Sequence, residues 1–244
     1  MNILITYITV CLNSEKYIKK CLSSICSQKN KNTEYIVIDG LSSDNTLKII
    51  NKFKNKIDYF QSNKDKGIYY AMNTAITKSR GTYLCFINSD DWLNVGSNKK
   101  IVKEIKKNKN IDIFYGDQKI YDKNLYLYSD ISDHHKLNRY MSLSHQSCYI
   151  KKKLFEKKKY STNLKLSSDY EFFLFFFKKK IKFKKINYNF SSFRVGGLSS
   201  NTELMIKEFF YIQKKYNHLF IAIVNFVNRY KFTFLKLFVK KIFY

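Results

Sequence analysis

Proline is absent from the sequence, glycine occurs only seven times, and the chain of 244 residues carries only 19 acidic residues. The composition excludes a collagen-like chain, and 45% hydrophobic with 17% aromatic residues is typical of a globular rather than a disordered protein. Long hydrophobic runs are also lacking. The most apolar late stretch, residues 219–227, has about half of the roughly 20 residues that a membrane-spanning helix needs, so no spanning helix is predicted.

Arginine is scarce as well. Lys and Arg together number 45 and give a net charge of +26, but only four are Arg: Arg80, Arg139, Arg194 and Arg229. A surface with this charge favours anionic partners. Proteins that read nucleic-acid bases depend on the forked guanidinium group, so no nucleic-acid partner is expected. Abundant Lys, Asn and Ile without proline is also typical of A/T-rich coding, which leaves the meaning of the charge open.

The cysteines number five, without the spacing of a metal site, and they are interpreted as reduced packing residues. They are Cys11, Cys21, Cys26, Cys85 and Cys148. The N-terminal residues lack the positive region of a signal peptide and lead directly into a strand-like segment. A cytoplasmic location is therefore expected.

Strand and helix patterns alternate through the first half of the chain, and the length predicts one domain or one domain with an appendage. Strands are predicted at residues 3–10, 35–38, 57–61 and 82–88, and helices at residues 18–25, 47–53 and 68–77. Such apolar strands joined by helices predict a mostly parallel sheet with helices on both faces. Ligands bind such sheets beyond the carboxyl ends of the strands, where Asp39, Asp65, Asp90 and Asp91 are expected to meet.

The sharpest motif is Asn88-Ser89-Asp90-Asp91, which follows the strand at residues 82–88. Adjacent carboxylates with a nearby amide suit a hard divalent cation such as Mg²⁺ or Mn²⁺, which could neutralise a diphosphate leaving group. The alternative interpretation is a turn that caps the helix after Trp92.

Three further residues carry a functional and a structural interpretation each. Asp39 ends a strand before a small-residue loop that could receive a nucleotide, although the same loop could be a simple turn with Asp44 as helix cap. Asp169 precedes a phenylalanine-rich run, where desolvation could make it a base near neutral pH, or it could cap a helix. His145 could contact a metal or phosphate, but a lone His is more often structural.

Six stretches of the chain occur in the order found in one known family. They are Tyr7-Ile8-Thr9-Val10 with residues 13–17, Tyr35-Ile36-Val37-Ile38-Asp39-Gly40 with residues 42–46, Asp65-Lys66-Gly67-Ile68-Tyr69 with residues 71–73, Gly81-Thr82-Tyr83 through Asp91, His145-Gln146-Ser147, and Ser168-Asp169-Tyr170-Glu171-Phe172. Together they span residues 1 to about 200. The chain thus resembles an inverting family 2 glycosyltransferase with the GT-A fold, of the small bacterial polysaccharide and O-antigen type.

The resemblance implies an α/β fold: a Rossmann-like three-layer α/β/α arrangement with a mostly parallel central sheet. It implies a catalytic domain at residues 1–200, with a nucleotide-sugar-binding half at residues 1–95 and an acceptor-binding half at residues 96–200. Residues 201–244 would add basic amphipathic helices, of which residues 217–244 have a pattern suited to an anionic membrane surface or to packing on the domain.

The resemblance also implies the site residues. Donor or nucleotide contacts would come from Thr9, Val10, Asp39, Asp65, Lys66, Gly67, Asn73, Asn88 and Asp90. Asp90 and Asp91 would hold Mn²⁺ or Mg²⁺, and Asp169 would be the general base. His145 and Arg194 would contact the diphosphate or the acceptor. The sequence departs from the family at Asn88, where a carboxylate is common, and in lacking proline after the first strand.

The expected activity is that of a hexosyltransferase-type enzyme. It would move one sugar from a nucleotide sugar, with a UDP-sugar expected, to a hydroxyl of a glycan or lipid-linked acceptor in cell-surface polysaccharide or lipopolysaccharide synthesis. The reaction would be inverting and metal-assisted, at the inner face of the cytoplasmic membrane, with a homodimer as a further option. The alternatives are a catalytically degenerate transferase and a non-enzymatic basic module that binds membranes or nucleic acid.

Overall fold

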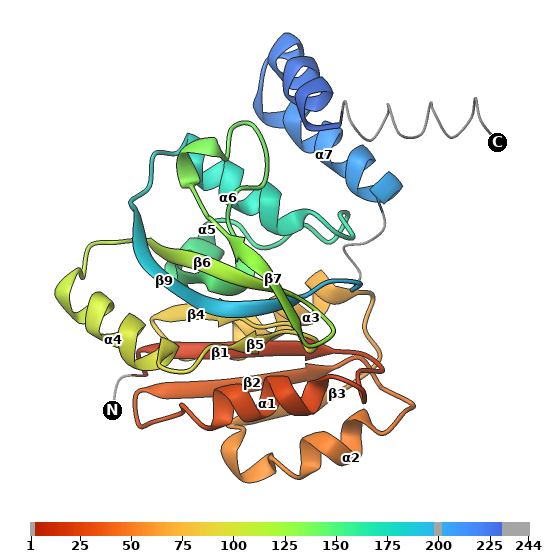
Figure 1. The fold of residues 1–244 in the computed structure, drawn as a ribbon, viewed down its shortest axis with the longest axis vertical. Coiled ribbons are helices and arrows are strands. Elements are labelled where there is room, and N and C mark those ends of the chain that lie inside the picture. The colour runs from red at the N-terminus through yellow and green to blue at the C-terminus, as the bar shows by residue number, and fades with distance from the viewer. Residues whose placement is uncertain (1–2, 198–201, 231–244) are drawn as a thin grey trace.

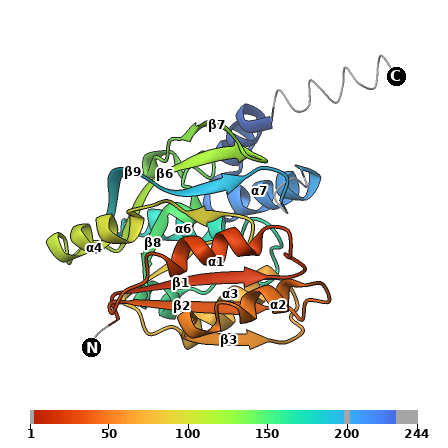
Figure 2. The ribbon, with the colours of Figure 1, turned by 60° about the horizontal axis from the view of Figure 1, so that its bottom comes forward.

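The computed structural model describes residues 3–197 and 202–230. A nine-stranded sheet forms its centre, with helices on both faces (Figures 1 and 2). The strands are β1 (Ile5–Cys11), β2 (Thr33–Asp39), β3 (Tyr59–Ser62), β4 (Tyr83–Phe86), β5 (Trp92–Leu93), β6 (Ile113–Asp122), β7 (Leu125–Asp130), β8 (Cys148–Lys151) and β9 (Phe183–Arg194). The α-helices are α1 (Ile18–Cys26), α2 (Thr46–Asn51), α3 (Ile68–Lys78), α4 (Ser97–Lys107), α5 (Lys153–Lys157), α6 (Ser168–Lys178) and α7 (Thr202–Tyr216).

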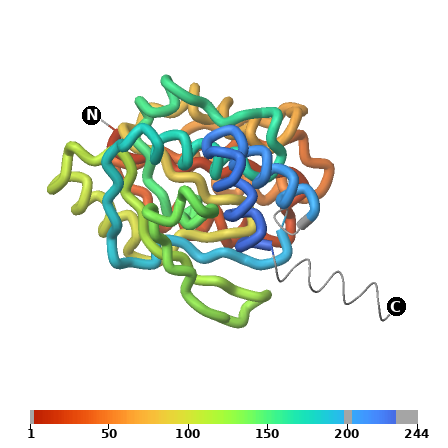
Figure 3. The backbone as a smooth tube through the Cα atoms, turned by 90° about the horizontal axis from the view of Figure 1, so that it is seen from above, coloured from red at the N-terminus to blue at the C-terminus, as the bar shows by residue number. Residues whose placement is uncertain are grey.

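The first half of the sheet is parallel, as predicted, in the order β3-β2-β1-β4. The second half is mixed: β8 runs antiparallel to β4 and β6, β9 runs parallel to β6, and β5 and β7 pair antiparallel with β9 and β6. The short turn between β6 and β7 leaves no room for a crossover, so these strands form an antiparallel hairpin. Figure 3 shows this hairpin projecting from the body of the protein.

Two hydrophobic layers hold the helices on the sheet, because successive side chains of a strand point to opposite faces. On β1, Ile5 and Tyr7 pack with α1, α2 and α4, whereas Ile8 and Val10 pack with α3, α5, α6 and α7. Both faces are covered, so β1 and β2 are buried along their whole length. The predicted three-layer α/β fold is confirmed.

Several helix ends differ from the sequence predictions. α1 begins at Ile18 without a side-chain cap, and Asn13, in the loop before it, adopts a φ of 49° and accepts a hydrogen bond from Ser43 N. The helix after Trp92 begins only at Ser97, so residues 88–91 do not cap it. In both places the polar residues serve loops at the sheet edge rather than the helix that follows.

The C-terminal part consists of α7 and a second helix, whose described residues are 219–230. Both lie over the α6 side of the molecule, at the top of Figure 1. Within the described residues, no helix has the length and apolar character needed to span a bilayer. Residues 231–244 of the predicted amphipathic segment lie outside the described residues.

Candidate active site

The candidate site lies where the strand order reverses, between β1 and β4. The chain leaves β1 toward β2 and β3 and returns on the other side as β4, and the loops beyond β1 and β4 border a crevice in sheets of this kind. The two loops touch: the hydroxyl groups of Ser14 and Ser89 form a hydrogen bond of 2.8 Å. The predicted acidic residues belong to this edge.

Asp39, at the end of β2, is fully buried, and its carboxylate is held by four donors. One oxygen accepts hydrogen bonds from the hydroxyl of Ser42 and the thiol of Cys11, and the other accepts from Ser42 N and the hydroxyl of Ser62. These contacts fix the loop after β2. They also leave the carboxylate in a defined orientation at the carboxyl end of the strand.

Asp65 and Gly67 form the adjoining turn before α3. The carboxylate of Asp65 accepts a hydrogen bond of 2.8 Å from Gly67 N. The other carboxylate oxygen lies close to Gly40, since a Cβ added there would be only 3.0 Å from it. Gly67 has a φ of 126°, a conformation that side chains rarely adopt, so α3 can begin at this sharp turn. Lys66 between them is exposed.

Asp90 and Asp91 are neighbours in the chain, but they differ in burial and in hydrogen-bond partners. Asp91 is buried, and its two oxygens accept hydrogen bonds from Gln146 Nε2 at 2.8 Å and Arg194 N at 3.0 Å. Burial, reinforced by the charge of Asp90, raises the pKa of Asp91 well above its usual range. Asp90 is partly exposed and pairs with Arg194 Nη2 at 3.2 Å. Of the two predicted metal ligands, Asp91 is therefore occupied by protein donors, and only Asp90 has an accessible carboxylate.

Arg194, from the end of β9, is the cation at this acidic edge. The edge formed by Asn88, Asp90, Asp91 and Arg194 is called the rim below. Its guanidinium group lies over the ring of Tyr17, 3.7 Å from the ring centre. Its Nε atom is buried and donates no hydrogen bond to any described residue, and the buried Oδ1 of Asn88 likewise accepts none. Buried polar atoms are normally paired, so an unpaired donor and an unpaired acceptor at one rim point to a bound polar ligand.

Asp169 lies in the first turn of α6 beside one aromatic hydroxyl and one imidazole. Tyr69 donates a hydrogen bond of 3.3 Å to Asp169 Oδ1, and His145 Nδ1 lies 3.7 Å from Oδ2. The other ring nitrogen of His145 is 2.9 Å from the hydroxyl of Tyr160. Burial lowers the pKa of His145, with the nearby Asp169 opposing this effect. His145 is thus held as a neutral ring between Tyr160 and the carboxylate.

One short segment joins the acidic rim to Asp169. His145 and Gln146 are consecutive residues of the 3₁₀ helix η3 (His145–Ser147), and they contact Asp169 and Asp91 respectively. Arg194 joins the same group through Asp90. Five predicted site residues are therefore connected through these contacts and through the peptide bond between His145 and Gln146: Asp90 and Asp91 from the loop after β4, His145 from η3, Asp169 from α6 and Arg194 from β9.

Three other residues that were predicted to contact the nucleotide sugar make side-chain contacts within the protein instead. The hydroxyl of Thr9 is in the core, bonded to Tyr35, and Val10 packs in the hydrophobic layer on the opposite face. Both side chains are turned into the core, so any contact of these two residues with a nucleotide sugar would come from their backbone atoms. The amide of Asn73 holds the backbone of Tyr160 at both its nitrogen and its oxygen.

The structure adds residues that sequence reasoning did not assign. Tyr17, Tyr69 and Gln146 lie inside the stretches that resemble the family, but no function was predicted for them. Tyr160 and Glu208 lie outside these stretches, and no sequence pattern indicated them. Glu208 of α7 accepts three hydrogen bonds from the backbone of residues 165–167, the loop that leads into α6. The C-terminal helices thereby fix the approach to Asp169.

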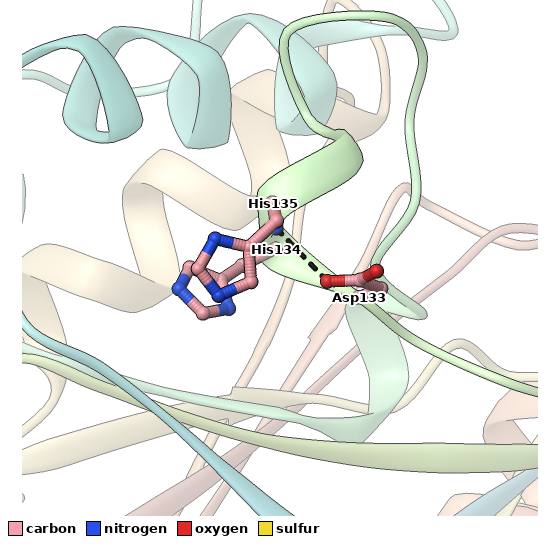
Figure 4. Close-up of side chains that lie close together, drawn as sticks. All are labelled: Asp133, His134 and His135. Atoms are coloured by element: carbon pink, nitrogen blue, oxygen red, sulfur yellow. Dashed lines mark hydrogen bonds between the residues drawn. The ribbon is translucent and has the colours of Figure 1, made fainter.

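A second group of side chains could in principle hold a metal ion: Asp133, His134 and His135, whose candidate ligand atoms lie within 4.8 Å of one another (Figure 4). Local contacts account for most of its polar atoms. Asp133 accepts a hydrogen bond from His135 N, shown as the dashed line, and His134 Nδ1 is 2.8 Å from the hydroxyl of Tyr115. Burial lowers the pKa of His134, and this ring packs flat on Phe183. The group therefore behaves as part of the turn.

Comparison with known proteins gives one family. The model of glycosyl transferase family 2 matches residues 6–204. The chain is 28% identical over 188 residues to glycosyltransferase GlyA of Streptococcus pneumoniae, a match that covers 68% of this chain and 27% of GlyA. It is 36% identical over 87 residues to the poly(ribitol-phosphate) beta-N-acetylglucosaminyltransferase TarS of Staphylococcus aureus, covering 34% of this chain and 15% of TarS. The chain thus spans a minor part of the length of these relatives.

Solved structures show the same fold. The crystal structure of Staphylococcus aureus TarS 1-349 in complex with UDP-GlcNAc matches with a TM-score of 0.73 and 19% identity, covering 92% of this chain and 67% of that one. The mannosyltransferase PcManGT of Pyrobaculum calidifontis, in complex with GDP-Man and Mn²⁺, matches with a TM-score of 0.63 and 12% identity, covering 85% and 61%.

Proposed function

The chain belongs to glycosyl transferase family 2, and from this we propose that it transfers a single sugar from a nucleotide sugar to a hydroxyl group of a glycan or lipid-linked acceptor. One observation carries the proposal: an acidic rim at the reversal of strand order is linked through η3 to the carboxylate of Asp169. A transferase needs a site for a diphosphate leaving group next to a base for the acceptor. The rim and Asp169 are suited to these two tasks.

We propose that the donor lies against the loops beyond β1, β2 and β4, with residues 1–95 forming the nucleotide-sugar half and residues 96–200 the acceptor half. Asp39 would accept N–H groups of the base, and Asp65 with Gly67 would lie against the nucleotide. UDP is the nucleotide that we favour, because TarS was solved with UDP-GlcNAc. GDP is the next candidate, because PcManGT was solved with GDP-Man and Mn²⁺.

A divalent cation fits the rim. Asn88 Oδ1 is a buried oxygen without a donor among the described residues, and Asp90, two residues later in the same loop, has a partly exposed carboxylate, so these two residues would hold Mn²⁺ or Mg²⁺. When bound, such an ion supplies positive charge that offsets the charge developing on a departing diphosphate. Arg194 can act in the same direction, because a diphosphate oxygen would satisfy its buried Nε.

Asp169 is proposed as the general base. Its carboxylate would take the proton of the acceptor hydroxyl while that oxygen attacks the anomeric carbon from the face opposite the leaving nucleoside diphosphate. A single displacement of this kind inverts the configuration at that carbon. The hydrogen bond from Tyr69 and the neighbouring ring of His145 support the proposal, because both hold the carboxylate in one orientation.

Synthesis of a cell-surface polysaccharide or lipopolysaccharide is the proposed setting. TarS is named for transfer of N-acetylglucosamine to poly(ribitol phosphate). A lipid-linked acceptor would bring the enzyme to the inner face of the cytoplasmic membrane as a peripheral protein, and a homodimer would be compatible with this position.

The test is donor cleavage by the purified protein. UDP- and GDP-sugars are incubated with Mn²⁺, and release of the nucleoside diphosphate is measured for wild type, for D169N and for the control D122N, which changes an exposed carboxylate at the end of β6. We expect metal-dependent release that D169N lowers at least tenfold and D122N leaves unchanged. Binding without release by wild type would indicate a degenerate transferase, and failure to bind any nucleotide sugar would reject the proposal.

A further inference from the structure

The helix of residues 219–230 carries exposed apolar side chains along one side. Leu219, Phe220, Ile223, Val224 and Val227 are each 40–77% exposed, and together they are named here the outer face. Their spacing of one, three, one and three residues places them on a single side of an α-helix. This helix is the dark blue one at the top of Figure 1.

The opposite side of the same helix is already packed against the protein. Ala222 is fully buried, and the ring of Phe226 lies 5.0 Å from that of Phe210 in α7. Tyr230 packs on Phe209, and Asn225 donates a hydrogen bond of 3.0 Å to the carbonyl oxygen of Asn138. These contacts determine the orientation of the helix. The outer face therefore points outward because the inner side is anchored, and the described residues do not cover it.

The C-terminal helices carry charged side chains of one sign. From Phe209 to Tyr230 the described residues include three Lys or Arg and no Asp or Glu. Among the described residues, Lys214 of α7 is exposed, whereas Arg229 lies on the packed side of its helix with Ala222 and Phe226, and its guanidinium group is 5.4 Å from the ring centre of Tyr140. An exposed apolar stripe on a chain with a net charge of +26 matches the boundary of an anionic bilayer, where acyl chains meet negative head groups. A second copy of the chain seated on the outer face would bring the same net charge of +26 to it, which disfavours a dimer through this face and leaves other surfaces for the homodimer named above.

We propose that the outer face docks this protein on an anionic lipid bilayer, with the helix lying in the plane of the surface. Phe220 and its neighbours enter the region of the acyl chains, and Lys214 lies near the head groups. This surface is separate from the donor site and does not depend on nucleotide binding. It is nevertheless coupled to Asp169 by packing, because the neighbouring α7 carries Glu208, which holds the loop before α6.

Vesicle flotation tests the proposal. Wild type, the double variant F220S/V224S and the control L125S/L127S, which changes exposed apolar residues of β7, are mixed with vesicles of equal phosphatidylglycerol and phosphatidylcholine or of phosphatidylcholine alone. We expect wild type to bind the anionic vesicles at least tenfold more strongly than the neutral ones. F220S/V224S should lose at least tenfold of this binding, and the control should stay within twofold of wild type.

A fluorescence measurement covers the case in which F220S/V224S does not fold. Because the chain has a single tryptophan, F220W adds one reporter at a highly exposed position. Its emission should shift to shorter wavelength with anionic vesicles, relative to wild type. Absence of wild-type flotation, equal binding by the double variant and the control, or an unshifted emission would overturn the proposal, as would a solution dimer that F220S/V224S dissociates. The docking proposal rests on the peripheral location named under the proposed function. UDP binding measured without vesicles reports on the donor site alone, so a failure of membrane docking is distinguishable from a failure of the transferase proposal.

Discussion

The imidazole of His145 lies between the hydroxyl of Tyr160 and the carboxylate of Asp169, with 2.9 Å from Nε2 to the former and 3.7 Å from Nδ1 to the latter. The ring is buried and stacked near Phe86, so it has little access to water. Neutral imidazole has one donor and one acceptor nitrogen. Tyr160 can donate to Nε2 while Nδ1–H points to Asp169, an arrangement that orients the proposed base and keeps the histidine uncharged.

The buried histidine predicts a pH dependence of stability. Its pKa is lowered in the folded state, so just below pH 6.5 the unfolded chain binds more protons than the folded chain, and the free energy of unfolding falls as the pH falls. H145Q has no titrating ring. Denaturant unfolding at pH 7.5 and 5.5 should therefore show a smaller loss of stability for H145Q than for wild type, while H218Q, at an exposed position, should behave as wild type. Equal losses in all three proteins would contradict the assignment.

The two neighbouring carboxylates of the rim should respond differently to amide substitution. D90N removes the accessible carboxylate and should weaken Mn²⁺-dependent UDP binding at least tenfold. D91N replaces a buried group that is already held by Gln146 and Arg194, so it should change UDP affinity less than threefold. Isothermal titration calorimetry with and without Mn²⁺ measures both effects. A loss confined to D91N would show that the buried residue is the ligand.

Restoring a carboxylate at residue 88 should strengthen the metal site. N88D would place a second charge beside Asp90, and its oxygen would replace an amide oxygen that lacks a donor among the described residues. We expect the Mn²⁺ concentration at half-maximal UDP binding to fall at least threefold. The melting temperature without metal should fall as well, because two carboxylates then repel each other. N110D, which adds the same charge at an exposed position before β6, is the control and should change neither quantity.

Glu208 should contribute to both stability and activity. E208Q leaves one carbonyl oxygen to serve three backbone N–H groups of residues 165–167, so we expect a loss of about 1–3 kcal/mol in the free energy of unfolding. Donor cleavage should fall as well, because the same loop leads into the helix of Asp169. E203Q changes an exposed carboxylate on the same helix, paired only with Lys207, and should leave both quantities unchanged. Equal effects of the two substitutions would show that the loop contacts are not important.

The sequence by itself determined the alternation of strands and helices in the first half, the acidic edge at the strand ends and the family. These features are local: a strand period, a helix period and a carboxylate after a strand can be recognised within a few residues. Residues 88–91 and 168–172 were found for the same reason.

Only the tertiary structure decided how these residues are used. The carboxylate of Asp91 accepts hydrogen bonds from residues 55 and 103 positions away in the chain. Tyr160 contacts His145 because Asn73 of α3 holds the backbone of Tyr160 in place. Such contacts depend on sheet register and on side-chain packing between distant segments, which local patterns do not contain. The outer face of residues 219–227 was likewise decided by the contacts of Phe226 and Tyr230, because an apolar helix shows its exposed side only once its other side is packed.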